Sequence, residues 1–257
     1  MKKAVYFLII FIAVQLIGGG TIHGLWQLIS GSEDMTTPEL ITTTVVCSVV
    51  VIVLFLWTRW AEVSPQWLRT RQWTVLSWSV VASLGALIPS MWLQEMIPEL
   101  PNWVENEFEM LLTNRWGYFT IGLLAPLSEE IVFRGAILRS LLHSPRISPW
   151  AAISVSAFFF ALIHMNPAQM PHAFLIGLLL GWMYQRTDSI LPGVAYHWAN
   201  NSVAYVLYNI YPNPDMKLKD LFKGSEQHVL LAVGFSLLIL LPALYQLHLW
   251  MRHADES

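Results

Sequence analysis

Long runs of apolar residues, separated by short polar segments, dominate the chain. A run of about 20 mostly apolar residues is long enough to cross a bilayer as a helix. Eight such runs are marked out at residues 4–29, 40–60, 73–92, 116–142, 150–165, 171–186, 191–208 and 228–251. We therefore predict an all-α fold, a polytopic transmembrane helix bundle of about eight spans that forms a single integral membrane domain over residues 1–257.

Two segments need separate interpretation. Residues 4–17 follow Met1, Lys2 and Lys3, as in a secretory signal, but the small-residue cleavage pattern is weak. We expect an uncleaved first span, with a cleaved signal as the alternative. In the polar segment 94–115, Val104, Phe108 and Leu111 share a helical face, which predicts a helix lying at the membrane surface.

Composition agrees with a membrane protein. The chain is 55% apolar and 12% charged, and its mean hydropathy is +0.52. The net charge of −3 argues against nucleic acid as a partner. Cys47 is the only cysteine, so the chain contains neither an internal disulfide nor a cysteine-based zinc site.

The basic residues predict the orientation of the bundle. Nine of them fall on the side of the termini: Lys2, Lys3, Arg59, Arg69, Arg71, Arg139, Arg146, Arg186 and Arg252. Four fall on the other side: Arg115, Lys217, Lys219 and Lys223. Because cytoplasmic loops carry the excess of Lys and Arg, we expect a multi-pass protein of a bacterial cell membrane with both termini in the cytoplasm.

Three charged residues lie inside the fourth apolar run. A charge at the centre of a span costs about 2.5–3.5 kcal/mol on insertion scales, so such residues usually mark a site. Glu130 and Arg134 are four residues apart with the acid first, the favoured spacing for an ion pair within a helix. Glu129 lies about 100° round the helix from Glu130. We predict that Glu130 and Arg134 support a site and that Glu129 is free for chemistry. The alternative is that all three residues are structural and form one polar cluster between helices.

Two of the next three apolar runs carry further polar residues. His164 ends the fifth run, and His197 shares a helix face with Asn201 in the seventh. Either histidine alone could be a packing residue or a hydrogen-bonding link between helices. His197 lies only about 12 Å along a helix from Ser189, so the Pro192-Gly193 start must lie deep or the helix must tilt if these side chains are to meet.

The motifs Glu129-Glu130-x-x-x-Arg134, Phe160-x-x-x-His164 and His197-x-x-x-Asn201 resemble, in order and spacing, those of the CAAX protease and bacteriocin-processing family. The resemblance covers residues 115–205, the expected catalytic core. It implies a glutamate-dependent intramembrane endopeptidase, related to type II CAAX prenyl endopeptidases, that acts on a membrane protein or peptide. By similarity, Glu129 activates a water molecule with help from His164, while His197 and Asn201 stabilise the oxyanion.

Two questions stay open at this point. Glu129, His164 and His197 could together bind zinc, but a metal-free glutamate–histidine mechanism uses the same residues. The family is also classed among metalloproteases, although the sequence has no His-Glu-x-x-His helix. The functional alternatives are a proton-relay or transport protein and a non-catalytic membrane scaffold with the same bundle.

Overall fold

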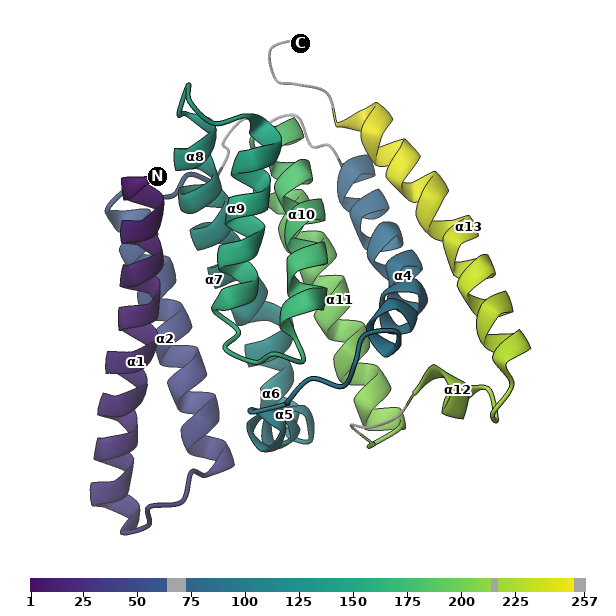
Figure 1. Cartoon of the computed structure of the whole chain (residues 1–257). Coiled ribbons are helices and arrows are strands. Elements are labelled where there is room, and N and C mark those ends of the chain that lie inside the picture. The colour runs from purple at the N-terminus through teal and green to yellow at the C-terminus, as the bar shows by residue number, and fades with distance from the viewer. Residues whose placement is uncertain (64–72, 214–216, 252–257) are drawn as a thin grey trace.

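The computed structural model describes residues 1–63, 73–213 and 217–251, and every regular element in these ranges is helical (Figure 1). The all-α helix bundle is thus confirmed. The long helices are α1 (Lys2–Ser30), α2 (Thr37–Trp57), α4 (Trp73–Glu95), α9 (Pro149–Leu162), α10 (Met170–Thr187), α11 (Leu191–Ile210) and α13 (Glu226–Trp250). Arg69, Arg71 and Arg252, used in the charge count, lie outside the described residues.

Of the described helices, α1, α2, α4 and α13 are long and apolar enough to cross a membrane by length and composition. The helices between them are shorter, interrupted or more polar. Two short helices lie outside the predicted spans: α5 (Glu105–Leu112), which corresponds to the predicted surface helix, and α12 (Leu218–Leu221), which lies in the polar segment before the last apolar run.

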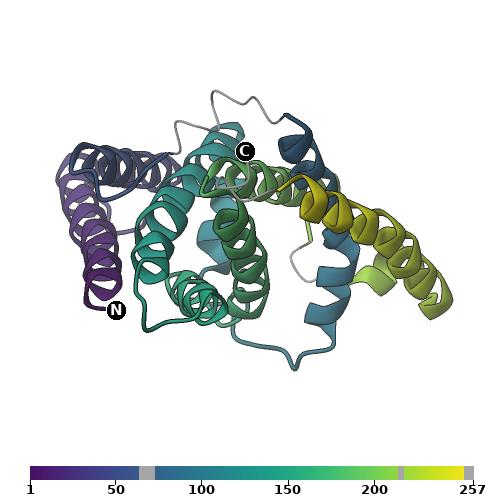
Figure 2. The same cartoon turned by 90° about the horizontal axis from the view of Figure 1, so that it is seen from above.

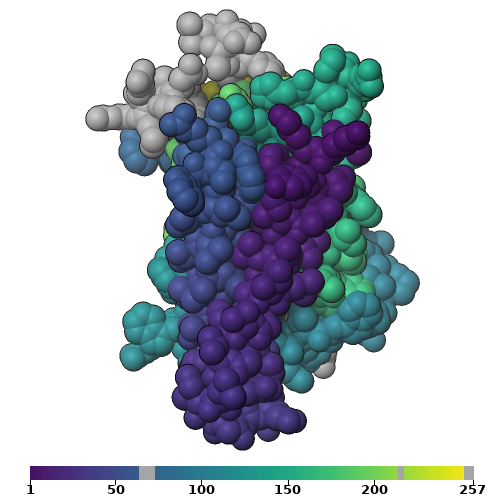
Figure 3. All heavy atoms as spheres, turned by 90° about the vertical axis from the view of Figure 1, so that its left-hand side faces the viewer, coloured from purple at the N-terminus to yellow at the C-terminus, as the bar shows by residue number. Residues whose placement is uncertain are grey.

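The long apolar helices flank a more polar centre. Helices α1 and α2 form one flank and fill one face of the molecule (Figure 3), whereas α4 and α13 form the other (Figures 1 and 2). Between them stand α9, α10, α11 and the segment that contains α7. The flanking helices expose large apolar side chains such as Ile17 and Leu238. Lipid would cover such surfaces, which leaves the centre as the place for buried charges.

The fourth predicted span is helical from Arg115 to Leu142 but is not a regular α-helix. It consists of α6 (Arg115–Tyr118), η1 (Phe119–Leu124), α7 (Ala125–Glu130), η2 (Ile131–Leu138) and α8 (Arg139–Leu142), where η1 and η2 have the wider π geometry. Such π segments occur often at functional sites. Here they flank the turn that carries Glu129 and Glu130.

Close packing of α9 and α10 depends on two glycines one turn apart. A Cβ atom on Gly177 would lie 2.9 Å from the Cα of Ala157, and one on Gly181 would lie 2.9 Å from the Ile153 side chain. Larger residues would push the helices apart. The same approach brings the Gly177 carbonyl within reach of the buried arginine of η2.

Helix α11 begins at a buried position beside η2. Ser189 and Ile190, which precede the helix, are both 1% exposed. A Cβ atom on Gly135, in η2, would lie 3.6 Å from the Ile190 side chain. The first turn of α11 therefore lies beside Gly135 of η2 and near Ala61 and Glu62, which follow the end of α2, and His197 follows within about two turns.

Candidate active site

The centre of the bundle holds a buried ion pair. Arg134 Nη1 donates to Glu130 Oε1 over 2.7 Å, and the two side chains are 1% and 0% exposed. Arg134 Nη2 also donates to the Gly177 carbonyl at 3.3 Å, and its guanidinium carbon lies 4.5 Å from the centre of the Phe160 ring. The pair predicted from the i, i+4 spacing is confirmed. Its contacts bind η2 to both α9 and α10.

His197 lies between the two glutamates. Its Nδ1 is 3.2 Å from Glu130 Oε1, and its Nε2 is 3.7 Å from Glu129 Oε2. Because the ion-paired Glu130 carboxylate accepts, Nδ1 carries a proton and Nε2 is left facing Glu129. The Glu129 side chain is 17% exposed, in contrast to Glu130, which is fully buried. The two adjacent acids therefore have different environments. Glu130 is held in the protein interior, whereas Glu129 is accessible to water.

His164 lies just beyond the C-terminal end of α9, although the sequence predicted the helix to continue to residue 165. Helix α9 ends at Leu162, and Met165 has a φ of +47° that does not continue a right-handed helix. The His164 Nδ1 donates to the Phe160 carbonyl at 2.8 Å, since a carbonyl can only accept. Its Nε2 is then an acceptor.

Phe160 connects the two histidines. Its ring meets the imidazole of His164 edge to face, with centroids 5.1 Å apart, and that of His197 in the same way at 5.7 Å. The motif phenylalanine thus packs against both imidazoles while its other contact, with Arg134, fixes its ring. We infer that this residue sets the relative placement of the charged and imidazole groups.

The Asn201 amide points to the backbone of η1. Its Nδ2 donates to the Ile121 carbonyl at 3.0 Å. That carbonyl is five residues before Pro126, and proline has no N–H to complete a π-type hydrogen bond. Asn201 therefore replaces a backbone donor, and its second N–H remains available to another acceptor. The neighbouring Asn200 donates to Asn201 Oδ1 at 3.3 Å.

Two nearby residues went unrecognised in the sequence. His172, on which the sequence analysis placed no role, lies partly buried at the start of α10. Gly193 lies against Glu130, where an added Cβ would be 2.7 Å from Oε2. The Pro192-Gly193 pair was visible only as a helix start.

The three candidate zinc ligands do not converge here. No group of three or more His, Cys, Asp or Glu side chains within the described ranges is arranged to hold a metal ion. Nδ1 of both His164 and His197 is already engaged, and of the three candidates only Glu129 and His197 are close together. This arrangement does not fit a three-ligand zinc site.

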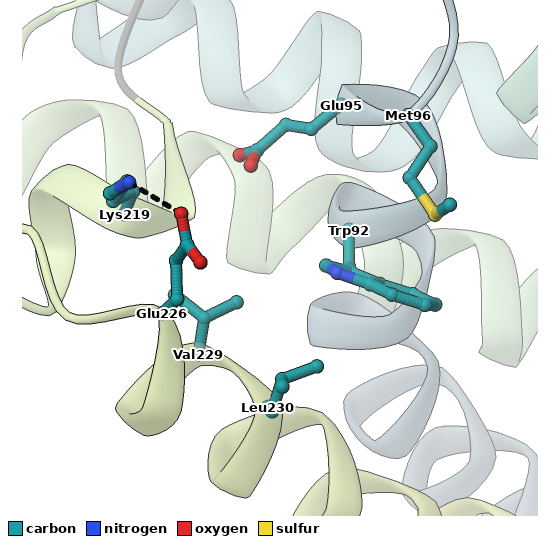
Figure 4. Close-up of a pocket in the computed structure, with 7 residues that line it drawn as sticks. All are labelled: Trp92, Glu95, Met96, Lys219, Glu226, Val229 and Leu230. Carbon is teal, nitrogen blue, oxygen red and sulfur yellow. Dashed lines mark hydrogen bonds and ion pairs between the residues drawn. The ribbon is translucent and has the colours of Figure 1, made fainter.

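A separate hollow of about 300 Å³ lies at the ends of α4 and α13 (Figure 4). It is lined by Trp92, Glu95, Met96, Lys219, Glu226, Val229 and Leu230. Its one cation, Lys219, is 2.7 Å from Glu226. None of these residues belongs to the Glu129–His197 cluster, so the hollow is not part of the candidate site.

Residues 111–203 match the family model described as type II CAAX prenyl endopeptidase Rce1-like. This match confirms the resemblance to the CAAX protease family. The Rce1-like segment contains all six predicted site residues: Glu129, Glu130, Arg134, His164, His197 and Asn201. No curated protein and no solved structure matches the chain. The family match supports a protease in a membrane, and the roles of the individual residues stay predictions.

Proposed function

We propose that the protein is an intramembrane endopeptidase that hydrolyses a peptide bond of a membrane-associated protein or peptide with a glutamate-activated water. The observation that carries the proposal is the 3.7 Å approach of Glu129 Oε2 to His197 Nε2 within the Rce1-like segment. A carboxylate and an imidazole this far apart can hold one water between them. Both lie inside a bundle whose outer helices are apolar.

In this mechanism Glu129 acts as the general base. It takes a proton from the water as the water oxygen attacks the scissile carbonyl carbon. The proton then passes to the leaving amine, so that the peptide yields a carboxylic acid and an amine and Glu129 is regenerated. His164, whose Nε2 is an acceptor, would help to orient the water. His164 and His197 pack against the same Phe160 ring, which supports a shared site.

The developing oxyanion would be stabilised by Asn201 and by His197 in the form that carries a proton on Nε2. Asn201 has one N–H left after its bond to Ile121, and Glu130 holds the His197 ring in a fixed orientation. In known oxyanion holes, a hydrogen-bond donor that is already in place before the reaction stabilises the transition state by about 3–4 kcal/mol. We propose that Glu130 and Arg134 support the site without contacting substrate, because both are fully buried.

The decisive variant is Glu129→Gln, which keeps the side-chain size and removes the base. The purified protein in lipid would be offered prenylated CAAX peptides, the substrate class in the family description, together with unprenylated and leader-type membrane peptides. We expect Glu129→Gln to lower kcat by about 10²–10⁴-fold. Cleavage at the wild-type rate by a folded Glu129→Gln protein would remove the proposal.

Zinc remains an alternative for the same residues, and it requires Glu129, His164 and His197 to converge further than they do here. Metal content and activity should be measured before and after chelation and again after zinc is added. Full activity in metal-free protein would exclude the zinc mechanism. Loss on chelation with recovery only on zinc addition would establish it. Proton flux without cleavage would instead favour the transport alternative.

A further inference from the structure

The turn that carries His164 is attached to a distant segment of the chain. Residues 101–103 lie in the loop between α4 and α5 and contact the turn between α9 and α10. Asn166 Oδ1 accepts from the Trp103 N–H at 3.1 Å, and Asn166 Nδ2 donates to Asn102 Oδ1 at 2.8 Å. The Ala168 N–H donates to the Pro101 carbonyl at 3.2 Å. We call residues 101–103 the strap.

Asn166 is the buried member of this attachment. It is 0% exposed, whereas the strap residues are exposed. Its backbone carbonyl accepts from the N–H groups of Gln169 and Met170 at 2.9 and 3.1 Å, which starts α10. A buried asparagine with both side-chain polar atoms paired is costly to remove, because its partners lose their bonds as well.

The residue between His164 and Asn166 holds an unfavourable conformation. Met165 has a φ of +47°, which costs a non-glycine residue roughly 1–2 kcal/mol. Such a conformation persists only when the surroundings impose it. Two sets of hydrogen bonds impose the Met165 conformation. On one side are the side-chain bonds of Asn166, and on the other is the bond from His164 Nδ1 to the Phe160 carbonyl. Without Asn166 the turn can relax, and His164 is the nearest functional side chain to move.

We propose that Asn166 is a positioning residue that holds His164 in its reactive placement by tying the α9–α10 turn to the strap. This inference rests on the proposed function and names a residue outside the three motifs. Asn166 acts through the backbone of the turn and need not contact substrate. Its loss should therefore lower kcat and leave KM nearly unchanged, since a shift of about 1 Å in a reacting group can cost about 10²-fold in rate.

The test compares Asn166→Ala and Asn166→Asp in the full-length protein in lipid. Alanine removes both side-chain bonds, whereas aspartate still accepts from Trp103 and can accept from Asn102 after that amide rotates. We expect Asn166→Ala to lower kcat by about 10–100-fold with KM within about twofold, and Asn166→Asp to recover most of kcat. The matched control is Asn209→Ala, because Asn209 ties α11 to the Leu112 carbonyl at 2.9 Å without touching the turn.

Hydrogen exchange of residues 162–168 in the same variants separates this inference from the proposed function. Faster exchange in Asn166→Ala alone supports it. Wild-type kcat in Asn166→Ala, or an equal loss in Asn209→Ala, overturns it while Glu129→Gln still reports on the proposed function. If the wild type cleaves no substrate, the proposed function fails. Unchanged exchange in Asn166→Ala would then show that Asn166 does not hold the turn.

Discussion

Glu130 connects three elements of the bundle: α7, η2 and α11. One oxygen accepts from Arg134 on η2 and from His197 on α11. The other is buried, has no hydrogen-bond partner among the described residues, and lies against the first turn of α11. The free N–H groups of a helix start favour a nearby negative charge. Glu130 therefore links helix packing to the orientation of the histidine.

Gly193 gives the Glu130 carboxylate its space, which leads to a first prediction. In Gly193→Ala the new Cβ would lie 2.7 Å from Glu130 Oε2, so the buried acid must shift. We expect a loss of about 1–3 kcal/mol in unfolding free energy, the usual cost of overpacking, together with reduced cleavage. The control is Gly234→Ala in α13, where nothing lies within 4 Å. Equal stability of the two variants would contradict the packing argument.

The buried ion pair can be compared with an exposed one in the same segment. Arg134→Ala leaves Glu130 charged and buried, so we expect a loss of about 3–5 kcal/mol. Arg139 and Glu62 are also 2.7 Å apart, but their side chains are 27% and 58% exposed. Arg139→Ala should cost no more than about 1 kcal/mol. Denaturation in mild detergent measures the unfolding free energy of both variants. Similar losses would show that burial does not decide how much an ion pair contributes to stability.

At the scale of elements, the irregular fourth segment creates acceptors that other helices satisfy. Pro126 removes an N–H that would otherwise reach the carbonyl of Ile121 or Gly122, and Asn201 on α11 supplies a donor. In η2, the Phe133 carbonyl accepts from Ser156 on α9 at 3.0 Å. In both π segments, backbone carbonyls thus accept hydrogen bonds from side chains of other helices, and these bonds fix specific contacts between helices.

A double-mutant cycle tests this exchange of donors. Asn201→Ala should destabilise the protein by about 1–3 kcal/mol, the cost of an unsatisfied buried carbonyl. In a Pro126→Ala background the restored backbone N–H can take over, so the same change should cost clearly less. Unfolding free energy is the measurement, which keeps the result independent of any catalytic role of Asn201. An identical cost in both backgrounds would refute the explanation.

For the whole molecule, the arrangement of helices constrains how the chain can sit in a bilayer. The start of α1 and the end of α13 lie at the same end of the bundle, and the α1–α2 connection lies at the opposite end (Figure 1). The excess of basic residues predicts that the end with the termini is cytoplasmic. Under this orientation, the strap and the His164 turn would lie towards the opposite side.

Cysteine labelling tests this orientation. In a Cys47→Ser background, Glu33→Cys in the α1–α2 connection and Pro145→Cys in the α8–α9 connection place one thiol at each end, and both positions are exposed. We expect a membrane-impermeant reagent added to intact cells to modify Glu33→Cys and to spare Pro145→Cys until the membrane is opened. The reverse pattern would invert the predicted topology.

The sequence by itself determined the positions of the long helices and the Glu130–Arg134 pair. Both follow from local rules, namely the length of an apolar run and the i, i+4 geometry of a helix face. The motif spacings also brought Glu129, His164, His197 and Asn201 into one hypothesis. No local rule, however, reports how far one helix is rotated or sunk relative to its neighbour.

Only the tertiary structure decided the remaining features. It placed the start of α11 beside η2, joined His197 to Glu130 as well as Glu129, and put His164 in a strapped turn beyond its helix. It also directed one Asn201 donor to a carbonyl that Pro126 leaves unpaired. Each feature depends on which surfaces of two helices meet, and that is set by packing among residues far apart in the chain.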